Sequence, residues 1–582
     1  MLRRIHRAFP PFASALVQTL EGGYGGRDLR ADILAGITVG IIAVPLALAL
    51  AIASGVPPQH GLYTAAIAGA VIALSGGSRF NVSGPTAAFV VILNPIALQH
   101  GLGGLLVATL MAGAMLVAMG WGRLGQLIQY IPHPVTTGFT GGIALVIASL
   151  QVKDFLGLHL APQAAHFAGR LGELVGALPS AEPLEAALAL STLAVLIGWP
   201  RLKTPVPAYL AAALFAGLAA WLLERSGADI VTIADRFQWS IGGRTGAGIP
   251  PLLPAFAWPW NLPGRDGAPL VLSFELVRAL AGPAFAIAML GAIESLLCAV
   301  IADGMTRRKH DPDAELVAQG LGNLIAPLFG GIPATGALAR TAASIRAGAH
   351  SPIASLVHAL FVLAAILLLA PLLSWLPMSG LAALLLMVAW NMSERRNFVR
   401  IVQVAPRGDV FLLLTCFGLT VMVDMVVAIT AGVVLASLFF MHRMSKVSMV
   451  KLVGEGSPGA PPDLPRDVRF YEIAGPLFFG AAERAMAALR NHDRGVRAVI
   501  LDLSAVPTID ATGLVALEQL IDELTAGGIF VALCAAQRNV LKVLGEAGYT
   551  KEKGRRWYFA SVDAAVKRLR AAPHEDGAVP GP

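Results

Sequence analysis

Long apolar runs, separated by short polar or Gly/Pro-rich connections, make up most of the first 446 residues. The run at 32–53 contains Pro45 but has the length of about 20 residues that an apolar helix needs to cross a bilayer. Similar runs predict helices at 60–75, 84–98, 102–120, 134–152, 183–199, 205–223, 274–302, 314–329, 335–347, 351–370, 374–391, 407–424 and 426–442. We therefore predict about fourteen membrane segments, of which 84–98 and 335–347 are too short to span alone.

The pattern changes from about residue 450. A Gly- and Pro-rich stretch at 454–462 is typical of a flexible linker. Beyond it, short apolar runs predict strands at 468–473, 498–503 and 529–534, and amphipathic runs predict helices at 481–490, 514–524 and 539–547. This alternation predicts a small soluble α/β domain.

These patterns predict the following division of the chain. We expect a cytoplasmic N-terminal segment at 1–31, a transmembrane domain at 32–446, a linker at 447–466, the α/β domain at 467–572 and a disordered tail at 573–582.

Composition supports a membrane protein and excludes an ordinary soluble one. Hydrophobic residues make up 56 % of the 582 residues and charged residues 14 %, and the mean hydropathy is +0.69. The three cysteines, Cys298, Cys416 and Cys534, are far apart, so we expect neither a disulfide nor a metal site. We see no catalytic set, no ATP-binding motif and no basic face with interleaved aromatic residues, so we expect no enzyme, no cofactor and no nucleic-acid partner.

Charge predicts the orientation of the chain in the membrane. An even number of segments places both termini on one side, and positive residues such as Arg123, Arg307 and Arg395 fall in connections on that side. In the opposite stretches, 153–182 and 224–273, positive residues are matched by acidic ones. Because positive residues concentrate in cytoplasmic loops, both termini are expected in the cytoplasm.

Two Gly/Pro-broken segments, 76–88 and 330–341, lie in the two halves of the predicted transmembrane domain. In each, a glycine pair leads into a polar stretch and then a short apolar helix, the pattern that marks substrate sites in transporters. Helix N-termini carry about half a positive charge each and suit an anion. Arg340 costs roughly 2.5–3.5 kcal/mol at a bilayer centre, so it should face a cavity or a partner.

These segments supply the candidate substrate-binding residues. Hydroxyl groups, backbone N–H groups at the two helix starts and one guanidinium could bind a dianion. The candidates are Ser83, Gly84, Thr86, Ala87, Thr335, Gly336, Ala337 and Arg340. Two alternatives stay open: the segments are simple Gly/Pro kinks, or Arg340 is the structural partner of a nearby carboxylate.

Glu294 is the candidate coupling residue. The spacing of Gly291, Glu294, Ser295 and Cys298 puts them on one helix face, which should look into the protein because lipid would penalise the carboxylate. Protonation of Glu294, or binding of a cation there, could switch the net charge of the site. The alternative is a fixed Glu294–Arg340 ion pair without a role in transport.

Other polar residues in apolar segments have simpler interpretations. Asp424, between two segments, is expected to cap a helix, and His358 is expected to be a core histidine with its hydrogen bonds satisfied. In the α/β domain, Asp510 precedes Ala511 at a predicted helix start.

Four stretches together carry a resemblance to a known family: 35–45, 76–93, 289–299 and 382–394. The chain resembles the SulP family of anion transporters with a C-terminal STAS domain, and within it the bacterial C4-dicarboxylate transporter branch. The resemblance implies an inverted 7+7 transmembrane fold with a core and a gate domain. It also implies half-helices that begin near Gly84 and Thr335 and meet at mid-membrane, a homodimer, and an elevator-like movement of core against gate.

The chain departs from the family pattern at two places. Leu46 and Leu50 stand where many members carry Gln and Tyr, so that side of the pocket should be more apolar. Ala511 stands where signalling relatives of the STAS domain carry a phosphorylated serine, so a phosphorylation switch is not expected there. The STAS domain is read as structural or regulatory, with a cytoplasmic protein as a possible partner.

These observations predict a secondary transporter in the bacterial inner membrane. The leading hypothesis is import of C4-dicarboxylates (succinate, fumarate, aspartate or malate) with protons. The alternative in the same class is a sulfate or bicarbonate transporter, with sodium as a possible coupling ion. A membrane sensor that signals through the STAS domain and a channel are rivals from other classes.

Overall fold

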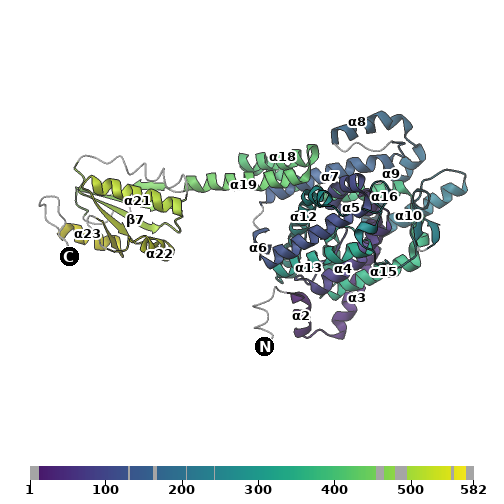
Figure 1. Cartoon of the computed structure of the whole chain (residues 1–582), viewed down its shortest axis with the longest axis horizontal. Coiled ribbons are helices and arrows are strands. Elements are labelled where there is room, and N and C mark those ends of the chain that lie inside the picture. The colour runs from purple at the N-terminus through teal and green to yellow at the C-terminus, as the bar shows by residue number, and fades with distance from the viewer. Residues whose placement is uncertain are drawn as a thin grey trace. The chain divides into compact units, whose positions relative to one another are not determined.

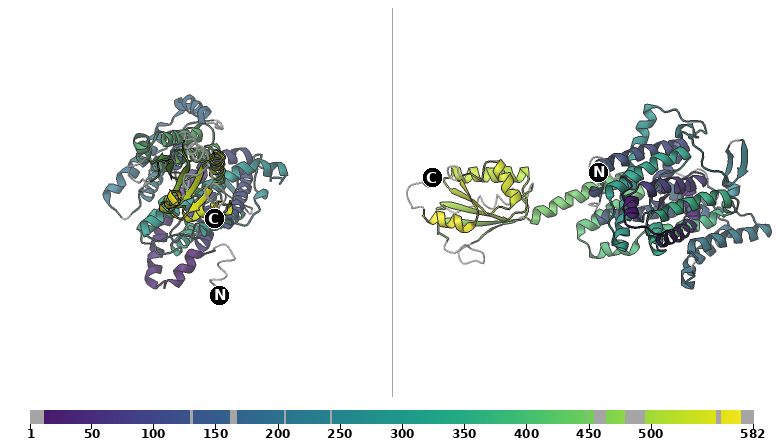
Figure 2. Two further views of the ribbon diagram at one scale, coloured as in Figure 1. Left: turned by 90° about the vertical axis from the view of Figure 1, so that its left-hand side faces the viewer. Right: turned by 90° about the horizontal axis from the view of Figure 1, so that it is seen from below.

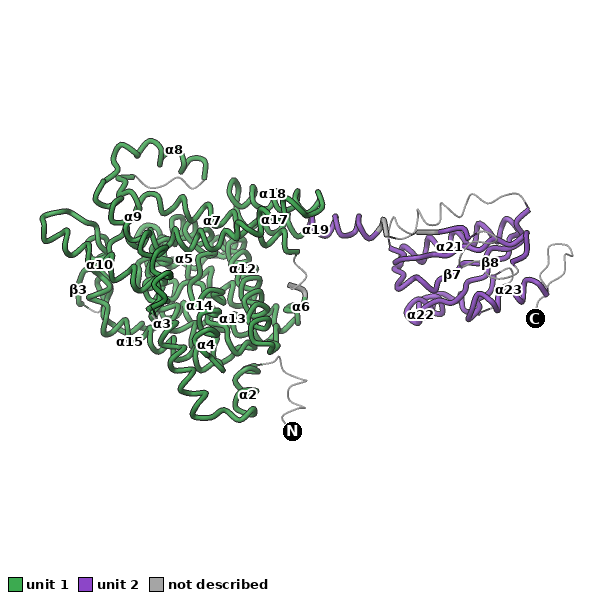
Figure 3. Tube along the Cα trace, turned by 180° about the vertical axis from the view of Figure 1, so that it is seen from behind, with its two compact units in different colours: residues 1–433 green, residues 434–582 purple. Residues whose placement is uncertain are grey.

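The computed structural model describes residues 12–128, 132–160, 167–204, 206–241, 243–447, 449–453, 464–478, 495–551 and 556–571. The chain divides into two compact units, residues 1–433 and 434–582 (Figure 3). Each is described by itself. The helix predicted at 481–490, most of the predicted linker and the predicted tail lie outside the described residues.

The first unit is helical (Figure 1). Its main helices are α2 (Ser14–Glu21), α3 (Gly26–Ala53), α4 (Gln59–Ser75), α5 (Ala87–Trp121), α6 (Gly125–Ile128), α7 (His133–Phe155), α8 (Phe167–Ala177), α9 (Pro183–Gly198), α10 (Ala208–Arg225), α11 (Ile233–Arg236), α12 (Phe274–Thr306), α13 (Pro312–Ile325), α14 (Leu338–Arg346), α15 (Ile353–Ser374), α16 (Met378–Met392), α17 (Arg395–Val404) and α18 (Arg407–Met422). Helix α19 (Met425–Val447) crosses into the second unit.

Each predicted apolar segment contains or overlaps a helix, which confirms the multi-pass membrane fold. Among the described residues, 8 helices are long and apolar enough to cross a membrane. The runs at 84–98 and 102–120 are the two halves of α5, which is broken at Gly101 with φ 71° and ψ −175°. Helix α3, which contains the first predicted membrane segment, begins at Gly26 and not at 32, because Asp28 accepts a hydrogen bond from the Gly25 N–H at 3.0 Å and fixes the helix start.

The helices of the first unit pack in two groups. One group contains α3, α4, α5, α12, α13, α14 and α15, and the other contains α7, α9, α10, α16 and α18. Helices from the first half of the sequence therefore lie among helices from the second half (Figure 1, Figure 2). Small residues allow close approach: a Cβ at Gly61 of α4 would lie 2.0 Å from the Ala47 carbonyl oxygen of α3.

A pair of short strands joins the two halves at the centre of the first group. Strand β1 (Ser83–Gly84) follows α3 and α4, and strand β4 (Thr335–Gly336) follows α12 and α13. They pair antiparallel, with Ser83 opposite Gly336 and Gly84 opposite Thr335. Because β1 leads into α5 and β4 into α14, the order of elements repeats in the two halves, as an inverted repeat requires. A separate hairpin, β2 (Gln238–Ile241) with β3 (Arg244–Ala247), follows α10 and α11.

The second unit contains a five-stranded sheet in the order β5–β6–β7–β8–β9. Its strands are β5 (Met449–Leu452), β6 (Val468–Ala474), β7 (Ala498–Ala505), β8 (Phe530–Cys534) and β9 (Arg556–Phe559), and its described helices are α21 (Ala511–Ala526), α22 (Arg538–Glu546) and α23 (Val562–Ala571). Strand β5 is antiparallel to β6 and the other pairs are parallel. The α/β prediction is confirmed.

Three elements of this unit were not predicted. Strand β5 lies inside the segment predicted as a linker, where its four residues pair with β6. Strand β9 and helix α23 were also missed. Helix α23 covers an apolar cluster around Phe530 and Trp557, whereas α21 and α22 cover the cluster around Leu501 and Leu520.

Candidate functional site

The half-helices start later than the resemblance implied. Helix α5 begins at Ala87 and α14 at Leu338, whereas Gly84 and Thr335 are paired in the strands. The strand pairing holds both backbones extended up to those positions, so a helix can begin only after the ladder ends. The structure nevertheless brings together all the candidate substrate-binding residues, because β1 and β4 are neighbours.

Arg340 lies in the first turn of α14 and is buried, with 3 % of its surface exposed. Its Nη2 donates a hydrogen bond to the Pro85 carbonyl oxygen, at the start of α5. Its Nε and Nη1 have no hydrogen-bond partner among the described residues. Gly84 makes room for this side chain, since a Cβ there would lie 2.6 Å from Nη1. Arg340 therefore offers free donors at the strand pair.

Glu294 lies on α12 and contacts Thr86, the residue that follows Pro85. Its Oε2 accepts a hydrogen bond from the Thr86 hydroxyl at 2.9 Å. No ion pair joins Glu294 to Arg340 in the described part of the chain. The fixed Glu294–Arg340 pair considered from the sequence is therefore absent, and each side chain is anchored on its own residue at the α5 start.

The face of α12 that carries Glu294 lies against the strand pair. The Gly291 carbonyl accepts a hydrogen bond from the Thr335 hydroxyl at 3.0 Å. Cys298 Sγ donates to the Thr341 hydroxyl at 3.2 Å. This arrangement agrees with the helix face predicted from the spacing, and it uses the Thr335 hydroxyl in a structural contact.

The candidate backbone donors at the two helix starts have different partners. Thr86 is the N-terminal cap of α5, but its hydroxyl points to Glu294 and does not cap the first turn. The N–H of Ala87, in that first turn, is one of the groups that a helix leaves without an internal partner. The N–H of Ala337, expected as an anion donor, instead donates to the Val82 carbonyl at 2.9 Å, because it extends the strand ladder.

A second buried carboxylate, Glu315 on α13, was missed at the sequence level. Its Oε2 accepts the N–H groups of Gly77 and Ser78 at 3.1 and 3.0 Å. Its Oε1 accepts Asn81 Nδ2 at 2.9 Å and Gln319 Nε2 at 3.0 Å. Glu315 thus holds the glycine lead-in to β1 in place. A carboxylate within the apolar run at 314–329 was the signal that could have found it.

Gln319 connects the Glu315 network to the candidate site, since its Nε2 also donates to the Ser83 hydroxyl at 2.9 Å. Gly336 packs close to α12, since a Cβ at Gly336 would lie 3.2 Å from the Ser295 Cα. Ser83 and Gly336 therefore shape the strand pair.

Two other sequence interpretations have clear outcomes. Asp424 accepts the Val427 N–H at 2.9 Å at the start of α19, which confirms its role as a cap. His358 is fully buried as expected, but the expectation that its hydrogen bonds are satisfied is wrong: neither ring nitrogen has a partner among the described residues.

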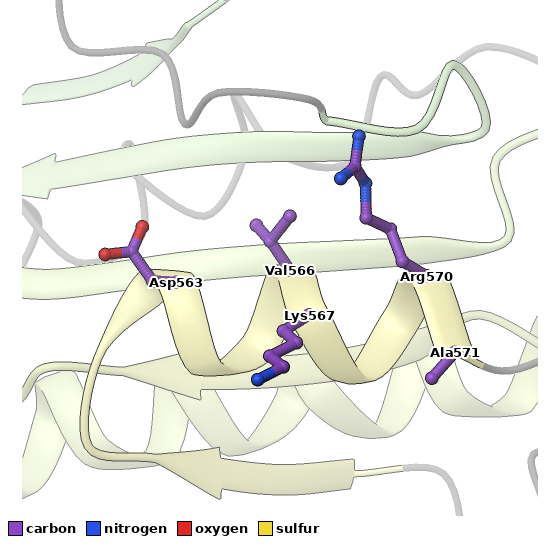
Figure 4. Close-up of a pocket in the computed structure, with 5 residues that line it drawn as sticks. All are labelled: Asp563, Val566, Lys567, Arg570 and Ala571. Atoms are coloured by element: carbon purple, nitrogen blue, oxygen red, sulfur yellow. The ribbon is translucent and has the colours of Figure 1, made fainter.

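The second unit has a surface cavity of about 490 Å³ on α23, lined by Asp563, Val566, Lys567, Arg570 and Ala571. Figure 4 shows Asp563, Val566 and Arg570 on one side of the helix and Lys567 on another. A single charged helix face of this kind is typical of a solvated surface, and it defines no chemistry. Among the described residues no cluster of His, Cys, Asp or Glu could hold a metal ion.

A multi-pass helical bundle with an inverted repeat, broken helices and a buried arginine at the break defines an integral membrane transporter. Residues 29–416 match the sulfate permease family, and residues 463–567 match the STAS domain. The chain therefore belongs to the sulfate permease family and is an anion transporter with a C-terminal STAS domain.

The sequence similarity to known relatives extends over nearly the whole chain. YvdB of Bacillus subtilis, whose name marks it as a candidate sulfate transporter, is 37 % identical over 538 residues, which cover 92 % of this chain and 97 % of that protein. The bicarbonate transporter BicA of Picosynechococcus is 29 % identical over 550 residues, which cover 90 % of both chains.

Solved structures agree in fold. The transmembrane domain of a cyanobacterial BicA superposes with a TM-score of 0.60 at 28 % identity and covers 70 % of this chain and 98 % of that domain. The murine anion transporter Slc26a9 in its inward-facing state gives a TM-score of 0.82 at 19 % identity, over 96 % of this chain and 94 % of that chain. The reported relatives carry sulfate and bicarbonate in their names, so the expected C4-dicarboxylate branch finds no support here.

Proposed function

We propose that this chain is a secondary transporter that moves a small oxyanion of the sulfate class together with a proton. The observation that carries the proposal is the separate anchoring of Arg340 on Pro85 and of Glu294 on Thr86. An anion that binds between α5 and α14 would meet a fixed positive charge and a carboxylate that forms no contact ion pair with an arginine of the described residues. Glu294 is the proposed coupling residue.

Charge counting decides between a dianion and a monoanion. Arg340 supplies one positive charge, and the N-termini of α5 and α14 supply about half a charge each. A dianion is balanced by these charges only when Glu294 is protonated. A monoanion is balanced when Glu294 is ionised. The site should therefore carry sulfate with a proton and bicarbonate without one, since an uncompensated buried charge is costly.

The proposed substrate class is supported by the relatives and by the donors of the site. Sulfate and bicarbonate stand in the names of the relatives, and a compact oxyanion could use the free Nε and Nη1 of Arg340 together with the Ala87 N–H. The C4-dicarboxylates were expected from a resemblance carried by the stretches 35–45, 76–93, 289–299 and 382–394, with Leu46 and Leu50 as a minor argument. Succinate remains the competitor against which the proposal is tested.

The membrane arrangement is part of the same proposal. We place the protein in a bacterial inner membrane with both termini in the cytoplasm, on the basis of the positive residues in one set of connections. The two helix groups correspond to a core and a gate whose relative movement would give alternating access. A homodimer and a cytoplasmic protein partner of the STAS domain complete the proposal.

The test uses purified full-length protein in liposomes with an inwardly directed pH gradient. Uptake of labelled sulfate, bicarbonate and succinate is followed, each with the other two as competitors. Sulfate uptake that follows the gradient and resists succinate supports the proposal. Preferred uptake of succinate would return the assignment to dicarboxylates, and uncoupled conductance would contradict a carrier.

A further inference from the structure

A cavity of about 450 Å³ lies between the two helix groups of the first unit. Residues of α5 and α12 line one wall, and residues of α7, α18 and α19 line the other. Helix α8 adds Phe167 and Arg170. The cavity is thus placed where a core and a gate would slide against each other, away from the strand pair.

Arg170 is a buried cation that the proposed transport site does not use. Only 5 % of its surface is exposed, and its Nε has no hydrogen-bond partner among the described residues. No described ion pair includes Arg170, although the negative charge of Glu173, one turn further along α8, acts on its guanidinium. The acidic residue that lines the same cavity, Asp424, already accepts the Val427 N–H as a helix cap. A buried guanidinium of this kind needs an anionic or polar partner.

The cavity and the transport site are at opposite ends of one half-helix. The first half of α5 begins at Ala87, beside the strand pair, and its residues Ile92, Ile96 and Gln99 line the cavity. At 1.5 Å per residue, Gln99 is about 18 Å along the helix from Ala87. An anion that left Arg170 toward the membrane centre would therefore follow α5 to the transport site.

We propose that Arg170, with the polar side chains of Gln99 and His100, forms a second anion-binding site that collects oxyanions at the mouth of the pathway on the α8 side. This inference rests on the proposed anion transport for its biological purpose, but the site is defined by its own residues. The guanidinium supplies the charge, and the amide of Gln99 supplies a neutral donor. Because α8 lies within the stretch 153–182, which the charge pattern places opposite the termini, the proposed site would face the periplasm.

The simpler explanation is that Arg170 only balances negative charge around it, that of Glu173 on α8 and that of Asp424 in the cavity lining. The two explanations differ in what an added anion does. If the cavity binds anions, sulfate must slow the reaction of a thiol placed there with negatively charged reagents. If Arg170 only balances nearby charges, sulfate must leave that reaction unchanged.

The experiment places a reporter thiol in the cavity of the full-length protein in detergent. Ala279 lines the cavity and is exposed, so Ala279→Cys is accessible. The native thiols of Cys298, Cys416 and Cys534 are buried and should stay unmodified. The rates of modification by a negatively charged and a positively charged methanethiosulfonate are compared. Their ratio reports the local potential.

With Arg170 present, the negative reagent should modify the thiol faster than the positive reagent does, and sulfate should slow this modification. Arg170→Gln should lower the ratio of the two rates at least about threefold and remove the protection. Arg170→Lys should keep the ratio of the two rates. The matched control is Arg244→Gln, at an exposed arginine of β3, which should leave the ratio and the protection by sulfate unchanged.

Arg340→Ala separates this site from the transport site. Protection by sulfate should persist in that variant, which has lost transport, if the two sites are distinct. Protection that disappears in Arg340→Ala, or that survives in Arg170→Gln, overturns the inference. If Arg170→Gln does not fold, the absence of sulfate protection in Ala279→Cys with Arg170 intact overturns it equally.

Discussion

The Thr86 hydroxyl donates a hydrogen bond of 2.9 Å to the Glu294 carboxylate. The neighbouring residue, Pro85, accepts a hydrogen bond from Arg340. The two charged side chains therefore hold adjacent residues at the start of α5 and do not hold each other. A change of charge on Glu294 can then alter the binding of an anion without breaking an ion pair.

Replacement of Arg340 should abolish anion binding at the transport site. Removal of one partner of a buried charged contact costs about 2–5 kcal/mol of binding free energy, which is more than tenfold in affinity. Arg340→Ala should abolish sulfate uptake, and Arg340→Lys should recover little because the planar fork is lost. Uptake into liposomes measures this. Arg346→Ala, on the exposed side of α14, should transport normally, and equal losses in both variants would assign the effect to the helix.

Gly84→Ala should impair transport more than it impairs folding. The new Cβ would lie 2.6 Å from Arg340 Nη1, which is the end of a long side chain and can move away. The guanidinium would then leave its anchor on Pro85. We expect a raised KM for sulfate with an almost unchanged melting temperature. Gly418→Ala is the control, since a Cβ there has no neighbour within 4 Å; parallel loss of stability and transport in Gly84→Ala would refute the argument.

Glu315→Gln should destabilise the protein, in contrast to a change at Glu294. Glu315 accepts four N–H groups, and an amide would turn one of its oxygens into a donor that faces other donors. A buried polar group left without its partner costs about 1–3 kcal/mol. Relative to the wild type, the melting temperature of the purified protein should fall for Glu315→Gln and remain unchanged for Glu294→Gln. The reverse order would show that the two carboxylates have been assigned the wrong roles.

Cys534 in the STAS domain should be unreactive in the folded protein. Burial, with a smaller effect of Asp502, raises the pKa of the Cys534 thiol from 9.0 to about 12. Folding therefore favours the thiol: its contribution to stability is complete below about pH 9 and is lost as the pH rises from there through about 12. Alkylation of the folded chain measures the reactivity.

The control for Cys534 is Ala511→Cys, at the exposed start of α21, which should react readily near neutral pH. Rapid modification of Cys534 before unfolding would contradict its burial.

Much of the transmembrane fold could be predicted because hydrophobic length and periodicity are local signals. The apolar runs, the glycine pairs before β1 and β4, and the face of α12 with Glu294 were all visible in the sequence. The pairing of Ser83 with Gly336 was not visible, because a strand of two residues has no periodicity and its partner lies in the other half of the chain. The loss of Ala337 as a donor follows directly from that pairing.

Three other features depended on tertiary contacts. Strand β5 looked like a linker because its neighbours in sequence are polar, and only the edge of the sheet makes it a strand. Glu315 gave the signal of a charge in an apolar run, yet its partners come from the lead-in to β1. The orphan ring nitrogens of His358 depend on which helices surround it. The C4-dicarboxylate branch was predicted from the resemblance of four sequence stretches, and the names of the relatives do not support it.

The most direct test of the proposed mechanism measures proton movement with sulfate. Liposomes with the wild-type protein and a trapped pH indicator are given an inward sulfate gradient and no initial pH gradient. We expect the lumen to acidify as sulfate enters. In Glu294→Gln, labelled sulfate should still exchange across the membrane while the acidification disappears, because the neutral amide replaces the protonated carboxyl. Acidification that persists in Glu294→Gln, or sulfate entry without acidification in the wild type, would contradict the central role of Glu294.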